Sequence, residues 1–185
     1  FPPDKLSWRK DELKSYLRNA DAILVSSPVY FGDRSSLAQD MIDLIRNDSQ
    51  LKAELCNKVY AGIAVGAKRN GGQETTLIYQ LLDMVNLGLL GVGNDAGTTS
   101  QYGGTGYAGD IGTMDKDNYG LWTSSGTGRR IARVAALIKY GQLTSLSGKV
   151  RIMFWVLQDK HNRALNYVNE LASQFDKRVE ATIIN

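Results

Sequence analysis

The chain has 185 residues, 43% of them hydrophobic and 22% charged, a balance typical of one soluble globular domain with a sizeable core. The formal net charge of +3 is small and the basic residues are scattered, which argues against nucleic-acid binding. A single cysteine, Cys56, excludes an internal disulfide and predicts a reducing, cytoplasmic location; we expect it to be buried as a small hydrophobic residue. No apolar run is long enough for a membrane span, and no signal peptide is visible.

Predicted helices and strands alternate along the chain. An amphipathic helix is predicted from about Ser7 to Asn19, with Ser7 as its N-cap. Beyond it, apolar runs predict strands over residues 22–27, 59–66, 90–93, 150–157 and 179–184. Amphipathic patterns predict helices over residues 36–46, 74–87, 119–140 and 163–175. The alternation favours an α/β fold in which five parallel strands have helices on both faces.

Two stretches show little periodicity. Residues 95–118 are rich in Gly, Thr, Tyr and Asp, and a run of this length predicts a functional loop; the alternative is an ordinary mobile surface loop. Residues 141–148 predict a polar linker.

The most informative segment follows the strand at 22–27 and reads Ser-Ser-Pro-Val-Tyr-Phe-Gly-Asp-Arg-Ser-Ser. A strand, a loop of small residues and then a helix is the layout of a ligand loop at the carboxyl end of a parallel strand. Pro28 ends the strand ladder, and Gly32 lets the backbone approach a ligand closely. Tyr30 and Phe31 offer a flat wall to a planar ring. The alternative is a turn whose aromatic side chains pack into the core.

A second loop, Gly-Ala-Lys-Arg-Asn-Gly-Gly-Gln, spans residues 66–73. Gly71 and Gly72 permit close approach of the backbone to a ligand. Lys68 and Arg69 add positive charge, which either meets a ligand phosphate or is solvated. Gln73 and Glu74 stand at a helix start, where an acidic residue favours the helix dipole, so we interpret Glu74 as a capping residue.

Three motifs now stand in chain order: Ser27-Pro28-Val29-Tyr30-Phe31-Gly32, Gly71-Gly72-Gln73-Glu74-Thr75-Thr76, and Tyr102-Gly103-Gly104-Thr105-Gly106-Tyr107-Ala108-Gly109. Together they resemble the flavodoxin-like NAD(P)H-dependent FMN reductases, especially the WrbA-type quinone reductases. Residues 128–135 also resemble the last helix of that family. The resemblance covers roughly residues 7–140, and the first two motifs are fairly specific in combination.

The resemblance implies a three-layer flavodoxin-like fold whose five-stranded parallel sheet has the order 2-1-3-4-5. The family begins with a strand–helix–strand unit, which is missing before Ser7; such a unit lies instead at residues 149–185. We therefore expect one circularly permuted domain over residues 1–185, in which the terminal unit follows the family-like part (1–140) and the linker (141–148). Phe1 and Asn185 would then lie close together. The alternative is a fragment whose terminal unit begins another domain.

By the same resemblance, the loops at residues 27–34 and 66–73 hold the ring of FMN, and the loop at 95–112 lines a cavity that nicotinamide and quinone share. Flavin chemistry leaves no catalytic role to a side chain. The predicted cofactor-binding residues are Pro28, Val29, Tyr30, Phe31, Gly32, Gly66, Lys68, Arg69, Asn70, Gly71, Gly72, Tyr102, Lys160, His161, Asn162 and Arg163.

The predicted phosphate loop departs from the family pattern. Residues 158–164 read Gln-Asp-Lys-His-Asn-Arg-Ala and contain no Gly, Ser or Thr, the usual phosphate donors of such a turn. Lys160, His161, Asn162 and Arg163 can donate in their place, whereas Asp159 opposes a dianion. His161 is the only histidine, and a lone exposed histidine is more often solvated or capping than catalytic. One Cys and one His cannot form the common zinc sites, so no metal is predicted.

The resemblance implies an FMN-dependent NAD(P)H oxidoreductase that passes hydride from NADPH or NADH through flavin N5 to a quinone or similar acceptor. It also implies a homo-oligomer. The altered phosphate loop motivates the alternative, a non-catalytic flavodoxin-like module that binds a partner protein or another ligand.

Overall fold

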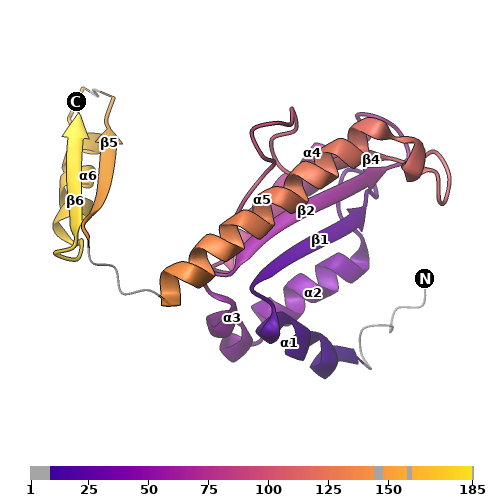
Figure 1. Ribbon diagram of the computed structural model, residues 1–185, viewed down its shortest axis with the longest axis horizontal. Coiled ribbons are helices and arrows are strands. Elements are labelled where there is room, and N and C mark those ends of the chain that lie inside the picture. Colours follow the sequence, from indigo (N-terminus) through magenta and orange to yellow (C-terminus); the bar gives the residue numbers. More distant parts are fainter. Residues whose placement is uncertain (1–8, 144–147, 158–159, 185) are drawn as a thin grey trace. The chain divides into compact units, whose positions relative to one another are not determined.

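The computed structural model describes residues 9–143, 148–157 and 160–184 (Figure 1). Contacts divide the chain into two compact units, residues 1–139 and 140–185, each described by itself. This division falls next to the predicted end of the family-like region at residue 140. Along its part of the chain, the first unit has the elements α1 (Lys10–Asn19), β1 (Ala22–Pro28), α2 (Ser36–Arg46), α3 (Ser49–Leu55), β2 (Val59–Gly66), α4 (Gln73–Asn86), β3 (Leu90–Gly91), β4 (Gly104–Tyr107), the 3-10 helix η2 (Met114–Lys116) and α5 (Asn118–Leu143).

The sheet of the first unit is parallel and centred on β2. Strand β1 pairs with β2 from Ala22 opposite Val59 to Pro28 opposite Val65. Strands β3 and β4 pair with β2 one after the other, β4 through Gly104 opposite Ile63. All these strands therefore point the same way, and β1, β2 and β4 end together at one edge of the sheet, where ligand loops of α/β proteins lie.

Strand β2 is apolar along almost its whole length because both of its faces are covered. Tyr60 belongs to a cluster with buried side chains of α1, α2, α3 and α4, whereas Val59 and Ala61 pack against Ile131 and Ala135 of α5. Figure 1 shows the same arrangement, with α5 on one side of the sheet and α2 and α3 on the other. The predicted layering, with helices on both faces, is confirmed for this unit.

Within this unit, β1 has a strand partner on one side only. Along β1 lies a groove of about 550 Å³. Its apolar lining comes from α1, β1 and α2 and includes Leu13, Leu17, Leu24, Leu37 and Met41. A sheet edge with apolar surroundings is a site where another strand can pair.

The second unit consists of β5 (Val150–Trp155), α6 (Arg163–Ser173) and β6 (Val179–Ile184). Its two strands are parallel, with Val150 opposite Val179. Helix α6 follows β5, and Phe154 stacks on Phe175 with ring centroids 6.1 Å apart. Met153 and Trp155 are 66% and 78% exposed, so this unit by itself leaves apolar surface of β5 uncovered. The predicted strand–helix–strand unit is confirmed.

Several local predictions differ from the structure. Helix α3 was not predicted; it is one short segment whose cap, Asp48, accepts a hydrogen bond from the Leu51 amide at 2.9 Å. The stretch 95–118, predicted to be a loop, contains β4 and η2. The pattern does not predict β4 because the glycine-rich segment Gly104–Tyr107 lacks the side chains that mark strands. Cys56 is exposed, not buried; it is the C-cap of α3, in the short connection to β2.

The chain ends and connections differ in smaller ways. Helix α1 begins at Lys10 after Arg9, which makes no side-chain cap, and the proposed cap Ser7 lies outside the described residues. Helix α5 continues to Leu143, into the predicted linker. Phe1 and Asn185, expected to be neighbours, also lie outside the described residues. Over the described ranges, no helix combines the length and apolar character that a membrane crossing requires.

Candidate functional site

The first motif forms a tight turn at the carboxyl end of β1. Tyr30 and Asp33 exchange backbone hydrogen bonds of 2.8 and 3.0 Å, and the two residues between them have positive φ, 53° at Phe31 and 82° at Gly32. We call residues 30–33 the aromatic turn. Phe31 is fully exposed and Tyr30 is 47% exposed, so the interpretation that these rings pack into the core is wrong. The turn presents its aromatic groups outward.

Both ends of the aromatic turn are fixed to the sheet and to α2. The Val29 amide donates to the Val65 carbonyl at 2.9 Å, at the end of β2. Ser27 is buried, and its hydroxyl oxygen accepts the Ser35 amide at 2.9 Å. Ser35 in turn caps α2. The local sequence therefore holds the turn at the edge where the strands end.

The second loop, residues 66–73, is organised around the buried side chain of Gln73. Its Oε1 accepts the Gly71 amide at 2.8 Å, and its Nε2 donates to the carbonyls of Lys68 at 2.7 Å and Gly106 at 3.0 Å. One amide side chain thus closes the loop on itself and ties it to β4. Asn70 takes a left-handed conformation within this loop, with φ 59°.

The two predicted ligand loops meet at Gly72. This residue has φ 101°, and a Cβ added to it would lie 2.7 Å from the Gly32 Cα and 3.1 Å from the Val29 Cγ1. Only glycine fits here, because both the backbone conformation and the space exclude a side chain. The second loop and the aromatic turn are therefore in direct contact, as expected for loops that share one ligand.

A cavity of about 570 Å³ adjoins the second loop, lined by Arg69, Asn70, Gly72, Gln73, Thr105 and Tyr119 among others. Arg69 forms an ion pair with Asp117, and its Nη1 donates to the Thr105 carbonyl at 3.1 Å. The guanidinium also lies 5.1 Å from the ring centroid of Tyr119, a cation–π distance. Arg69 is thus partly exposed but fixed in position.

Asp117 holds this wall of the site together. Its carboxylate accepts hydrogen bonds from the Tyr107 amide at 2.7 Å and the Gly120 amide at 3.0 Å, besides pairing with Arg69. Burial by itself raises the pKa of Asp117, but the hydrogen bonds from Gly120, Arg69 and Tyr107 outweigh it and hold the pKa below its usual value.

Asp117→Asn is expected to lower the free energy of unfolding by about 1–3 kcal/mol at neutral pH, the usual effect of losing hydrogen bonds to a buried charge. Because the folded-state pKa is depressed, the stabilisation is present above the unfolded pKa of about 3.9 and is lost as pH falls through the folded value. Urea unfolding at several pH values measures the difference. Asp115→Asn, an exposed change in the 3-10 helix η2 that Asp117 follows, is the control. If the loss of unfolding free energy in Asp117→Asn does not become smaller in acid, this role of Asp117 is contradicted.

The structure brings together most of the predicted residues of the first unit, those of the aromatic turn and of the second loop. Tyr102 is not among them: it precedes β4 by two residues, and β4 starts beside the middle of β2 rather than at its carboxyl end. Lys160, His161, Asn162 and Arg163 belong to the second unit, where Asn162 has φ 51° and precedes α6. Their roles stay predictions.

Sequence analysis missed several residues that shape this site. Gln73 was noted only as part of the second motif and of a helix start, Tyr119 only as the start of a predicted helix, and Asp117 fell at the end of a stretch without periodicity. The only signal in the sequence was an acidic residue, Asp117, just before the helix predicted to start at residue 119. Across the described ranges, no three His, Cys, Asp or Glu side chains gather as a metal site would require.

Comparison with known proteins places these observations in a family context. The sequence profile described as NADPH-dependent FMN reductase matches residues 4–99, just over half of the chain. An iron-sulfur flavoprotein of Methanocaldococcus jannaschii is 40% identical over 129 residues, which cover 70% of this chain and 66% of the relative. An NAD(P)H dehydrogenase (quinone) of Methylocella silvestris is 31% identical over 134 residues, covering 66% of this chain and 67% of the relative.

The chain thus spans about two thirds of the length of these curated relatives. Among solved structures, a flavodoxin, WrbA-like protein from Agrobacterium tumefaciens matches with a TM-score of 0.50 and 24% identity, over 66% of this chain and 71% of that one. At this identity the likeness shows the fold alone: a flavodoxin-like α/β fold with a parallel sheet.

Proposed function

Because this chain belongs to the NADPH-dependent FMN reductase family, we propose that it binds FMN and catalyses electron transfer from NAD(P)H to a quinone-like acceptor. The observation that carries this proposal is the contact of the two motif loops at Gly72 and Gly32, on the edge where parallel strands end. The cytoplasmic location remains a prediction. A homo-oligomer is supported by exposed apolar residues along α4, namely Tyr79, Leu82 and Val85.

The residues present fit a flavin. The glycine at position 72 leaves open the space that a Cβ would fill, and the adjoining cavity of about 570 Å³ lies in the size range of small-molecule sites. Tyr30 and Phe31 are exposed on the aromatic turn, whose Gly32 lies against Gly72. Loop 66–73 would supply backbone N–H donors to the polar edge of the ring, as glycine-rich loops do where the backbone approaches a ligand.

When bound, FMN supplies the hydride chemistry, from the nicotinamide to N5 and on to the acceptor. The protein's own task is to position the flavin ring and to polarise it. The aromatic turn would flank the ring, and loop 66–73 would bind its pyrimidine edge. Arg69, fixed by Asp117, places a positive charge near that edge or near the phosphate of NADPH. We assign no catalytic acid or base to a side chain.

The iron-sulfur relatives raise the question of a cluster. Clusters of the common types need four cysteine thiolates. The 185 residues contain one cysteine, Cys56, which is exposed after α3 and belongs to neither motif loop. We propose that the redox chemistry of this part of the protein rests on the flavin.

We further propose that the chain forms one circularly permuted domain with the five-strand order 2-1-3-4-5. Three observations support it. Strand β1 lacks a partner on one edge within its unit, beside an apolar groove. The second unit is a parallel strand–helix–strand, the kind that the family has at its beginning. Met153 and Trp155 leave apolar surface uncovered, although parallel strands are normally buried on both faces.

In this arrangement β5 pairs with the free edge of β1, and residues 160–163 at the start of α6 face the FMN phosphate. Hydrogen–deuterium exchange on the full chain tests the pairing. The amides of Leu24 and Ser26 alternate with those that donate to β2 and so point to the free edge; they should be protected in the full chain, and Leu24→Pro should release β5 and β6 to fast exchange. Slow exchange in β5 and β6 that is indifferent to Leu24→Pro would favour a terminal unit that begins another domain.

The function itself is tested with the purified full chain. FMN should bind with quenching of its fluorescence, and NADPH should bleach the bound flavin under anaerobic conditions. A quinone should then restore the colour. A chain that quenches no FMN fluorescence would favour the alternative, a non-catalytic flavodoxin-like binding module. That alternative is supported by the sequence of residues 158–164, which contains no Gly, Ser or Thr to hold a phosphate.

A further inference from the structure

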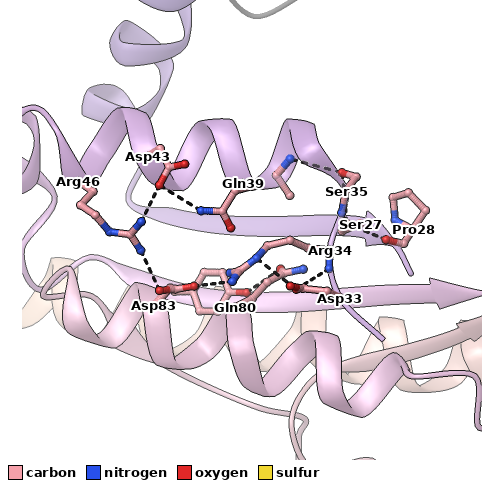
Figure 2. A network of polar contacts seen from close by, with 12 residues as sticks. Ser27, Pro28, Asp33, Arg34, Ser35, Gln39, Asp43, Arg46, Gln80 and Asp83 are labelled. Atoms are coloured by element: carbon pink, nitrogen blue, oxygen red, sulfur yellow. Dashed lines mark hydrogen bonds and ion pairs between the residues drawn. The ribbon is translucent and has the colours of Figure 1, made fainter. Parts of the chain in front are cut away.

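A buried arginine follows the aromatic turn directly. The side chain of Arg34 is only 9% exposed, and its Nη2 lies 2.6 Å from the Asp83 Oδ2 on α4 (Figure 2). Charged side chains are rarely buried unless they are paired. The ion pair with Asp83 therefore decides where this arginine, and the chain next to it, can lie.

The other nitrogen atoms of the Arg34 guanidinium have few alternative polar partners. Nε is 3.4 Å from the Asp33 Oδ1, a long contact, and among the described residues neither Nε nor Nη1 has a hydrogen-bond partner. In the same region, Tyr60 donates to the Gln80 Oε1 at 3.0 Å. Burial raises the pKa of Tyr60, Arg34 lowers it and Asp83 raises it, consistent with all three lying close together. Asp83 is thus the principal partner of Arg34.

Helix α4 links this ion pair to the second loop. Gly72 and Gln73 form the start of α4, where Gly72 touches Gly32 of the aromatic turn. Asp83 lies on the same helix, ten residues after Gln73. At 1.5 Å per residue, the two positions are about 15 Å apart along the helix. One rigid element therefore contacts the first loop at two separate places, through Gly72 and through Asp83.

We propose that Asp83 is a positioning residue that acts through Arg34: their ion pair fixes the aromatic turn relative to loop 66–73 and so sets the fit of the flavin ring. This inference rests on the proposed function, because it assumes that the two loops hold FMN. Neither Asp83 nor Arg34 is assigned a contact with the cofactor.

The same carboxylate offers a matched control. Arg46 of α2 places its Nη2 2.9 Å from the Asp83 Oδ1, but its side chain is 45% exposed and it is twelve residues away from Arg34 (Figure 2). Arg34→Met removes the partner next to the turn and leaves Asp83 paired with Arg46. Arg46→Met removes the other partner and leaves the turn anchored.

We expect Arg34→Met to weaken FMN binding about tenfold, the change that follows from losing one charge-assisted contact, and to alter the visible circular dichroism of the bound flavin. Arg46→Met should change FMN affinity less than about twofold, as expected for an exposed ion pair. Without FMN, Arg34→Met should also speed hydrogen exchange at the Tyr30 and Asp33 amides, whereas Arg46→Met should not.

A double variant, Arg34→Met with Asp83→Leu, separates positioning from stability. Replacing a buried ion pair by apolar side chains is often neutral for stability, so the unfolding free energy should return toward the wild-type value while FMN affinity stays weak. Recovery of FMN affinity together with stability, or equal effects of the two single variants, overturns the inference. If the wild-type chain binds no FMN, the proposed function fails, and the exchange measurement still decides whether Asp83 holds the turn through Arg34.

Discussion

Gly72→Ala is expected to abolish FMN binding and to lower the free energy of unfolding by about 2–6 kcal/mol. The left-handed conformation at φ 101° costs a residue with a Cβ about 1–3 kcal/mol. The overlap of that Cβ with the Gly32 backbone at 2.7 Å adds about 1–3 kcal/mol of packing strain. Relief of the overlap would push the aromatic turn away from loop 66–73 and so open the proposed ring site.

Gly112→Ala is the matched control for this variant. Gly112 also has positive φ, 77°, but an added Cβ there would meet none of the described atoms within 4 Å. The Gly112→Ala variant should therefore lose only the stability that the left-handed backbone conformation costs, and its FMN affinity should be unchanged. Urea unfolding and FMN fluorescence titration measure both quantities. If the two glycine variants behave alike, the contact between the loops has no role in binding.

Gln73→Glu is expected to have the second largest effect, a loss of about 2–4 kcal/mol in stability and a marked loss of FMN affinity. The introduced carboxylate cannot donate to the carbonyls of Lys68 and Gly106, so two buried acceptors lose their partner and a charge is buried against them. Loop 66–73 then loses both its closure and its tie to β4.

The pH dependence of this variant has a definite sign. Burial against carbonyl oxygens raises the pKa of the introduced carboxyl group above its unfolded value. The deficit should therefore be small in acid, where the group is protonated and can donate, and should grow as pH rises through the folded pKa. Gln101→Glu, the same change at an exposed position, should show no such pH dependence in urea unfolding. A deficit that is constant with pH would argue against a buried charge.

The layered architecture could be predicted from the sequence because it depends on periodicity. Strand β2 is almost entirely apolar, and α2 carries one apolar stripe, so their types and approximate ends follow from pattern alone. Strand β4 could not be found this way. Gly104 and Gly106 leave it little side chain to form a pattern, and its place in the sheet is specified by pairing with β2 and by contacts with α5.

The candidate site likewise divides into residues that the sequence pattern predicts and residues that it does not. The aromatic turn and the glycines of loop 66–73 were predicted because special backbone geometry leaves a trace in residue type. Gln73, Asp117 and Arg34 carry no such trace, since an amide or a charged residue at these positions is equally compatible with an exposed surface. Their importance comes from partners 33, 48 and 49 positions away, Gly106 for Gln73, Arg69 for Asp117 and Asp83 for Arg34, which only the folded chain brings together.

The free edge of β1 has a consequence for synthesis of the protein. In the proposed permuted order β5, the strand that covers this edge, is made only after α5, and its own neighbour β6 is made later still. At about 5–20 residues per second, the 41 residues that follow Leu143, up to Ile184, take about 2–8 seconds to translate. During that interval the nascent sheet is unfinished, and newly made chains on neighbouring ribosomes can join edge to edge. Slow synthesis of the last strands would therefore lower the yield of folded protein without any change in its final stability.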